Sequence, residues 1–85
     1  MSTNDNFKLL RAFGQIVRER RTELGISQEA FAHQAGLHRT YVSGIERGLR
    51  NTALVNLFRI AEALELTPQE LIGRINSLLA VSQNK

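Results

Sequence analysis

Residues 28–47 read QEAFAHQAGLHRTYVSGIER, and this stretch decides the fold. Its first eight residues carry apolar side chains at helical spacing, and Ser27, which precedes them, is a good N-cap residue. Gly36 suits the positive φ that ends a helix, and a second short helix is predicted over about 39–47. Because only two residues separate the glycine from that helix, the two helices must cross steeply.

The side chains of this stretch have the sizes that such a crossing needs. Ala32 supplies a small side chain where the two helices approach closely, and Val42 and Ile45 anchor the second helix in the core. The remaining inward positions hold Phe31, Ala35 and Leu37. The stretch therefore predicts a helix-turn-helix.

The segment before this pair predicts one long helix. Its apolar residues recur at steps of three and four over about Phe7–Leu24. Asp5 or Asn6 is expected near the N-cap, and Gly25 just beyond the last turn. Residues 1–6 are polar for the most part and are expected to be flexible.

Two more helices are predicted after the pair. Thr52 is expected to cap the first of them, over about Ala53–Leu64. Pro68 starts the second, because Thr67 and Glu70 can form a capping box around a proline in the first turn. The predicted inward positions of the earlier helix are Leu54, Leu57, Ile60 or Ala61, and Leu64.

The whole chain has the size of one small domain. Its 85 residues are 42% hydrophobic, which suffices for one core and leaves no room for a second. We therefore expect a single all-α domain of five helices over 1–85, with residues 82–85 flexible like the first six. The 11 basic residues outnumber the 8 acidic ones, and the pI of about 10.2 favours a polyanionic partner.

Several classes of function are excluded by what the sequence lacks. It has no cysteine, and its two histidines, His33 and His38, have no acidic partner at metal-ligand spacing, so no metal site is expected. No Gly-rich phosphate loop follows a strand pattern, and five short helices leave little room for a concave catalytic site. No apolar run is long enough to cross a bilayer, so the expected location is the cytoplasm. We expect neither an enzyme, nor a cofactor, nor a small-molecule ligand.

A wider set of residues resembles a known family. The helix-turn-helix and its surroundings resemble the lambda-repressor-like (XRE) family of bacterial and phage DNA-binding regulators. Within that family, the run Arg39–Arg47 followed by Arg50 and Asn51 is similar to the controller proteins of restriction–modification systems. The matching positions outside the run are Phe13, Gly14, Ile16, Arg18, Arg21, Gly25–Glu29, Ala35–Leu37, Gly48, Ile60, Ala61, Ala63, Leu64 and Pro68. The chain departs from the family at His38, where Ser or Thr is common, and at Thr52, where proline is usual.

The resemblance implies contacts to double-stranded DNA. Residues expected to meet base edges lie on the recognition helix, about 39–47, and are Arg39, Thr40, Ser43 and Gly44. Arg39 can donate two hydrogen bonds to one guanine, whereas Gly44 adds no side chain and permits close approach. Residues expected at the DNA backbone are Gln28, Tyr41, Arg47, Arg50 and Asn51. Packing is the alternative role for Tyr41, and a base edge is the alternative partner for Arg50.

Two further sets of residues are expected to stabilise the fold and the assembly. The family pairs the glutamate matching Glu46 with the arginine matching Arg21, so a structural ion pair is implied. The last helix carries more aliphatic residues than one core-facing stripe needs, which predicts a homodimer interface. Those residues are Leu71, Ile72, Ile75, Leu78 and Leu79. The alternative is that the last helix only closes the bundle.

The expected function is therefore transcriptional regulation, as a homodimer on a palindromic operator. Positions 39–59 contain four arginines and one acid, so the basic charge lies where DNA contact requires it. Whether such a protein acts as a repressor or an activator depends on the position of its operators, which no residue encodes. The alternative class is a protein-interaction module on the same fold, whose recognition helix no longer reads DNA.

Overall fold

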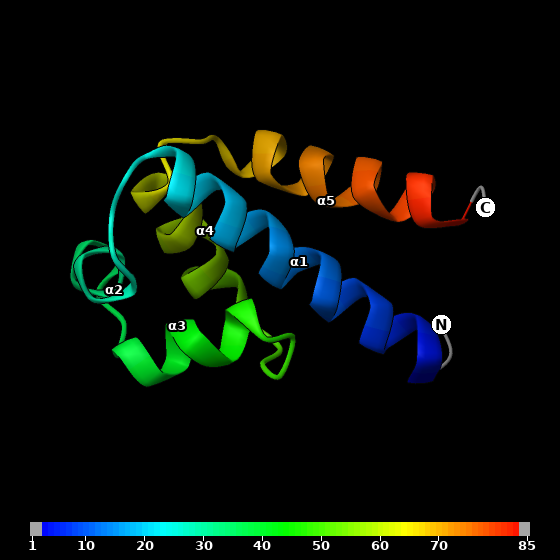
Figure 1. Ribbon diagram of the computed structural model, residues 1–85, viewed down its shortest axis with the longest axis horizontal. Coiled ribbons are helices and arrows are strands. Elements are labelled where there is room, and N and C mark those ends of the chain that lie inside the picture. Colours follow the sequence, from blue (N-terminus) through cyan, green and yellow to red (C-terminus); the bar gives the residue numbers. More distant parts are fainter. Residues whose placement is uncertain (1–2, 84–85) are drawn as a thin grey trace.

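The computed structural model describes residues 3–83 and forms five helices. They are α1 (Thr3–Glu23), α2 (Gln28–Ala35), α3 (Arg39–Glu46), α4 (Leu54–Ala63) and α5 (Pro68–Gln83). α1 crosses the middle of the molecule, with α5 along one side and α3 along the other (Figure 1). Every element among the described residues is a helix, so the predicted all-α fold with its helix-turn-helix at α2 and α3 is confirmed.

The turn between α2 and α3 is built by local signals. The hydroxyl of Ser27 accepts a hydrogen bond of 3.0 Å from the backbone N–H of Ala30 at the start of α2. Gly36 ends α2 with a φ of 71°, a left-handed conformation that suits a residue without a Cβ. His38 stands at the N-cap of α3, where its side chain forms no capping hydrogen bond.

The core is formed by buried side chains from all five helices. Ala32 is almost fully buried, so the small residue stands where the helix crossing needs one. Seven larger side chains are fully buried, and together they represent all five helices: Val17, Phe31, Val42, Ile45, Ile60, Leu64 and Leu71. The side chains that were predicted to face the core within residues 28–47 therefore do so in the structure.

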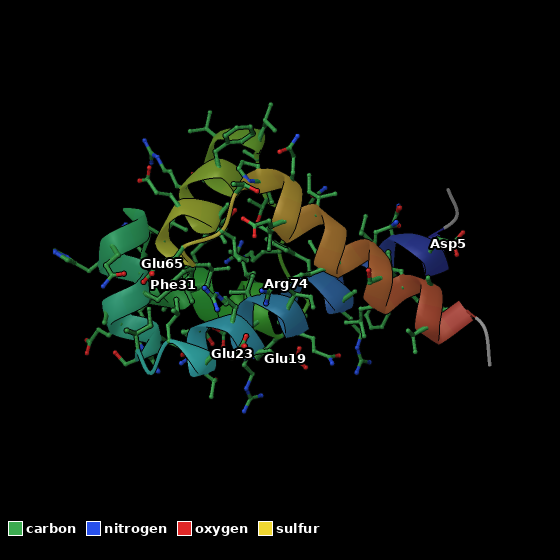
Figure 2. The ribbon with its side chains drawn as sticks, turned by 90° about the horizontal axis from the view of Figure 1, so that it is seen from above. Asp5, Glu19, Glu23, Phe31, Glu65 and Arg74 are labelled. Atoms are coloured by element: carbon green, nitrogen blue, oxygen red, sulfur yellow. The ribbon has the colours of Figure 1, made fainter. Side chains whose placement is uncertain are left out.

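Two arginines fasten α1 to later helices. The Nε of Arg20 donates a hydrogen bond of 2.9 Å to the carbonyl oxygen of Leu64, at the end of α4. Arg74 of α5 lies beside Glu23 of α1, with Nη1 3.6 Å from Oε1 (Figure 2). The first contact satisfies a carbonyl at a helix end, where intrahelical partners run out. The second is an exposed pair that contributes little to stability.

The structure corrects the predicted start of the long first helix and the predicted start of the flexible tail. α1 begins at Thr3, so Asp5 and Asn6 lie inside its first turns and do not cap it. An acidic side chain is favourable there because it faces the positive end of the helix dipole. At the other end of the chain, α5 continues to Gln83, so the predicted flexible segment starts too early. Residues 1–2 and 84–85 lie outside the described part.

The start of α4 also differs from the prediction. Ala53, not Thr52, is the N-cap residue, and the hydroxyl of Thr52 is buried without a hydrogen-bond partner among the described residues. Leu54 is 70% exposed, although the helical pattern placed it in the core. It stands at the first turn of α4, beyond the edge of the core that Ile60, Ala61 and Leu64 enter.

Candidate nucleic-acid interface

The start of α3 presents polar side chains to solvent. Arg39 and Thr40 are exposed, Ser43 and Tyr41 are half-buried, and Val42 and Ile45 are turned into the core. The alternation arises because α3 is amphipathic, with its apolar residues at steps of three. The buried pair therefore fixes which face of α3 looks outward, and that face carries a guanidinium group and two hydroxyl groups.

Gly44 does not belong to that exposed face, which corrects an expectation from the sequence. Its backbone is buried under the side chain of Arg50, and a Cβ built on it would lie 2.9 Å from the Arg50 Cγ. The guanidinium carbon of Arg50 lies 5.7 Å from the centre of the Tyr41 ring, within the range of a cation–π contact. The glycine thus makes room for Arg50, and the surface at this turn of α3 is formed by the arginine.

An ion pair between Arg21 of α1 and Glu46 holds the C-terminal end of α3. Nε of the arginine lies 2.7 Å from Oε2 of the glutamate, and Nη2 lies 3.0 Å from Oε1. The two side chains are only 14% and 3% exposed, so the pair lies largely away from solvent. The hydrogen bond to Glu46 raises the pKa of Arg21 above its usual value, although burial acts in the opposite direction.

Two further hydrogen bonds extend this ion pair to the start of α2. Nη1 of Arg21 donates to the carbonyl oxygen of Ile26 at 2.9 Å, and the amide of Gln28 donates to Glu46 at 3.0 Å. The network joins α1, the α1–α2 loop, α2 and the end of α3. Glu46 therefore has a structural role, and Gln28, which the sequence analysis placed at the DNA backbone, has its side chain committed to Glu46. No sequence pattern indicates this contact between Gln28 and Glu46.

The loop after α3 carries the remaining predicted backbone contacts. Arg47, Arg50 and Asn51 are all exposed. With Arg39 they place three guanidinium groups along and beyond α3, whereas the single acid of this region is Glu46, already paired with Arg21. The outward surface of α3 and its loop is therefore positively charged, as a surface that binds a polyanion must be.

The aliphatic residues of α5 divide between core and surface. Leu71 is fully buried and Ile75 is 7% exposed, so these two cannot form the predicted dimer interface. Leu78 and Leu79 are half-buried, and Ile72 is exposed. The reason is that α5 packs on α1 and α4 along the stripe of Leu71 and Ile75, which leaves the neighbouring stripe outside.

α4 carries exposed apolar residues that the sequence analysis missed. Leu54, Val55 and Phe58 are each more than half exposed. Phe58 lies outside the stripe of inward positions on α4. A large aromatic residue at such a position could have indicated an exposed apolar surface. A depression of about 580 Å³ between α4 and α5 is lined mainly by apolar side chains, among them Leu54, Leu57, Phe58, Ile72 and Leu79. We call this depression the α4–α5 groove.

Comparison with known proteins agrees with this geometry. A family described as helix-turn-helix matches residues 17–71, which include α2 and α3 in full. The chain therefore belongs to the helix-turn-helix family of DNA-binding transcriptional regulators, of the lambda-repressor-like (XRE) type. Among its relatives are control proteins of restriction–modification systems.

Two such relatives are similar over most of both chains. Control protein C.BamHI of Bacillus amyloliquefaciens is 46% identical over 69 residues, which cover 80% of this chain and 83% of the relative. Control protein C.MunI of a Mycoplasma species is 42% identical over 66 residues, covering 78% and 89%. These relatives are named as regulators, which agrees with the expectation that the chain is not an enzyme.

Solved structures of controller proteins have the same fold. The restriction–modification controller protein C.AhdI from Aeromonas hydrophila is 53% identical, with a TM-score of 0.71 over 73% of this chain and 94% of that one. The wild-type controller protein C.Esp1396I is 31% identical, with a TM-score of 0.75 over 91% and 92%. No helix within residues 3–83 combines the length and the hydropathy needed to cross a membrane.

Proposed function

We propose that this protein binds palindromic operator DNA as a homodimer and regulates transcription in a restriction–modification system. The observation that carries the proposal is the outward face of α3, where Arg39, Thr40 and Arg50 are exposed. The Arg21–Glu46 network holds α3 in place behind this face. The similarity to control proteins over four fifths of the chain supports the biological setting.

The start of α3 supplies the contacts to base edges. Arg39 is exposed at the first position of the helix, from which its two N–H groups reach O6 and N7 of a guanine in the major groove. Thr40 and Ser43 offer hydroxyl groups on the same face. Positioning is the role of Arg47, Arg50 and Asn51, which meet the sugar–phosphate backbone beside the groove.

The proposed dimer interface is the α4–α5 groove, so it includes residues of α4 as well as of α5. Leu54, Phe58 and Ile72 are exposed together at its rim, and exposed apolar residues clustered in one depression mark an interaction site. A two-fold axis would bring the groove of one protomer against that of the other, so that each Phe58 enters the opposite groove. Such a dimer presents two copies of α3 to half-sites about 34–36 Å apart.

The proposal is tested by selecting bound sites from a pool of random duplex DNA. We expect the selected sites to be palindromic, with two half-sites separated by about one helical turn. Sedimentation of the protein with the selected duplex should give two protomers per site. A protein-interaction module on the same fold would select no sequence and would show no retarded band at low or moderate salt, and that result contradicts DNA regulation as the function.

The setting in a restriction–modification system needs its own measurement. Transcription from the promoters next to this gene should change when the protein is supplied, and the change should depend on the selected palindrome. If those promoters contain no such site and do not respond, the protein regulates other genes, although its DNA-binding activity still stands.

A further inference from the structure

A second surface combines positive charge with exposed apolar side chains, away from the start of α3. It is a shallow depression of about 380 Å³ between α1 and the end of α3 with the loop that follows it. We call its central residues, Phe7, Arg11, Arg18 and Leu49, the α1–α3 patch. Phe7 is 51% and Leu49 61% exposed, and the guanidinium carbon of Arg11 lies 5.6 Å from the centre of the Phe7 ring.

The charge of this depression is positive because its one acidic lining residue is already occupied. Glu46 lines it but is 3% exposed and holds Arg21 and Gln28. Arg11 and Arg18 are exposed, and Arg47 borders the depression on the side of the recognition helix. An incoming anionic group would therefore meet guanidinium groups without competition from Glu46.

The backbone beneath the patch is fixed by close contact between α1 and the end of α3. A Cβ on Gly14 would collide with the carbonyl oxygens of Ile45 and Glu46, so α1 lies directly against α3 there. Gly48 lies against Arg11, where a Cβ would come 2.9 Å from the arginine Cγ. The patch is thus a preformed surface whose two halves cannot separate without breaking the packing of α1 against the end of α3.

We propose that the α1–α3 patch binds an acidic peptide segment that carries apolar side chains, presented by a partner protein. The carboxylates of such a segment pair with Arg11 and Arg18, and its apolar side chains cover Phe7 and Leu49. A phosphate backbone would match the two arginines but would leave both apolar side chains without a partner, which favours peptide over DNA. The patch lies at the opposite end of α3 from Arg39, about 12 Å along the helix axis.

This inference goes beyond DNA binding, because it gives the DNA-bound molecule a separate surface for protein contact. The test is a titration of the full chain, followed by amide NMR signals, with three synthetic peptides of equal length. The first alternates acidic and large apolar residues, the second replaces its apolar residues by serine, and the third replaces its acids by lysine. We expect the first to shift the signals of Phe7, Arg11 and Leu49, and the other two to bind at least about tenfold more weakly.

Matched variants separate the patch from general charge and apolarity. Arg11→Glu and Leu49→Ser should each raise the dissociation constant of the first peptide by about tenfold. Arg74→Glu makes the same change, and Val81→Ser a comparable one, at exposed positions outside the patch, and both should leave that constant unchanged. The proposal is overturned if the first peptide shifts no patch signal, or if the serine peptide binds as tightly as the first.

A DNA measurement distinguishes the patch from an extension of the operator contacts. Binding to a mixed-sequence duplex is measured against salt for Arg11→Glu, with Arg74→Glu as the reference for an equal change of net charge. We expect the two variants to behave alike. A salt slope reduced by about one for Arg11→Glu alone would assign Arg11 to a phosphate and would overturn the peptide proposal.

Discussion

At the scale of single residues, the burial of Glu46 has the largest expected effect on stability. Glu46→Gln removes the charge that Arg21 faces at 2.7 Å while nearly preserving the shape of the side chain. Removing one partner costs about 3–5 kcal/mol in a buried pair and under about 1 kcal/mol in an exposed one. Because the Arg21 side chain is 14% exposed, we expect about 2–4 kcal/mol, measured as a lower midpoint of urea unfolding.

Glu23→Gln is the matched control for that variant. It breaks the exposed pair with Arg74, whose atoms are 3.6 Å apart, by the same chemical change, made on α1 instead of α3. We expect it to shift the free energy of unfolding by less than about 1 kcal/mol. If the two variants unfold at the same urea concentration, the network around Glu46 does not stabilise the fold.

Arg39 and Arg50 should differ in the kind of binding that they support. Arg39→Ala should weaken operator binding by about 1–3 kcal/mol and relax selection at one base pair. Arg50→Ala should weaken binding to operator and random DNA alike and reduce the salt slope by about one. Equal losses on both kinds of DNA for Arg39→Ala would remove Arg39 from base recognition.

Gly44 should act on DNA through Arg50. Gly44→Ala is compatible with the helical backbone of α3, but its Cβ would lie 2.9 Å from the Arg50 Cγ and must displace that side chain from Tyr41. We expect the folded state to survive and DNA affinity to fall about as much as in Arg50→Ala. In a double-mutant cycle the effect of Gly44→Ala should disappear once Arg50 is alanine. Additive losses would show that Gly44 acts independently of Arg50.

At the scale of helices, the capping box of α5 should make stability depend on pH. The backbone N–H of Thr67 donates to Glu70 Oε1 at 2.8 Å, and its hydroxyl accepts from the N–H of Glu70 at 3.0 Å. The backbone hydrogen bond is the main cause that lowers the pKa of Glu70, followed by its side-chain hydrogen bond with Thr67. A lowered folded-state pKa contributes stability above the unfolded value of about 4.3, and this contribution is lost as pH falls through the folded value.

Glu70→Gln should therefore destabilise the protein near neutral pH and have less effect in acid. We expect the difference between the urea midpoints of the two proteins to shrink from about pH 6 to about pH 3. Glu62→Gln, on the exposed surface of α4, controls for the loss of one negative charge. A difference that stays constant over this range would mean that the charge of Glu70 does not contribute.

Helix ends were predictable from sequence where a local interaction decides them. Ser27, Gly36 and the Thr67–Glu70 box act within four residues, and the structure has each in its predicted role. The predicted N-cap of α4 was wrong. Thr52 has a preference for a cap position, but its side chain is buried in the loop after α3 and Ala53 is the N-cap residue. Local propensity is a weak prior where tertiary contacts compete.

The division of apolar residues between core and surface was harder to predict than the helices themselves. Periodicity shows that Leu71 and Ile75 share a face and that Ile72 lies on a neighbouring one, but both faces are apolar. Only the packing of α5 against α1 and α4 decides which face is covered. The contact of Arg50 with Gly44 could not be predicted for the same reason. It depends on how the loop after α3 folds back onto that helix, which periodicity does not show.

At the scale of the whole molecule, the α4–α5 groove should control both assembly and operator affinity. An aspartate at Ile75 would test folding and not assembly, because that side chain lies in the core. Phe58→Asp places the charge at the exposed rim of the groove, where a folded monomer is the expected product. Losing the second recognition helix should weaken binding to a palindromic site by about a hundredfold or more, since the two half-sites are no longer linked.

Sedimentation and operator binding measured on the same samples check this prediction. Val81→Asp is the matched control, because Val81 is an exposed apolar residue of α5 that does not line the groove. It should remain a dimer with unchanged operator affinity, while both proteins keep their helical content. If the unmodified protein is a monomer at about tens of micromolar and stays one on a palindromic duplex, the groove is not a dimer interface. One protomer would then bind each duplex, and the loss in affinity for Phe58→Asp would disappear.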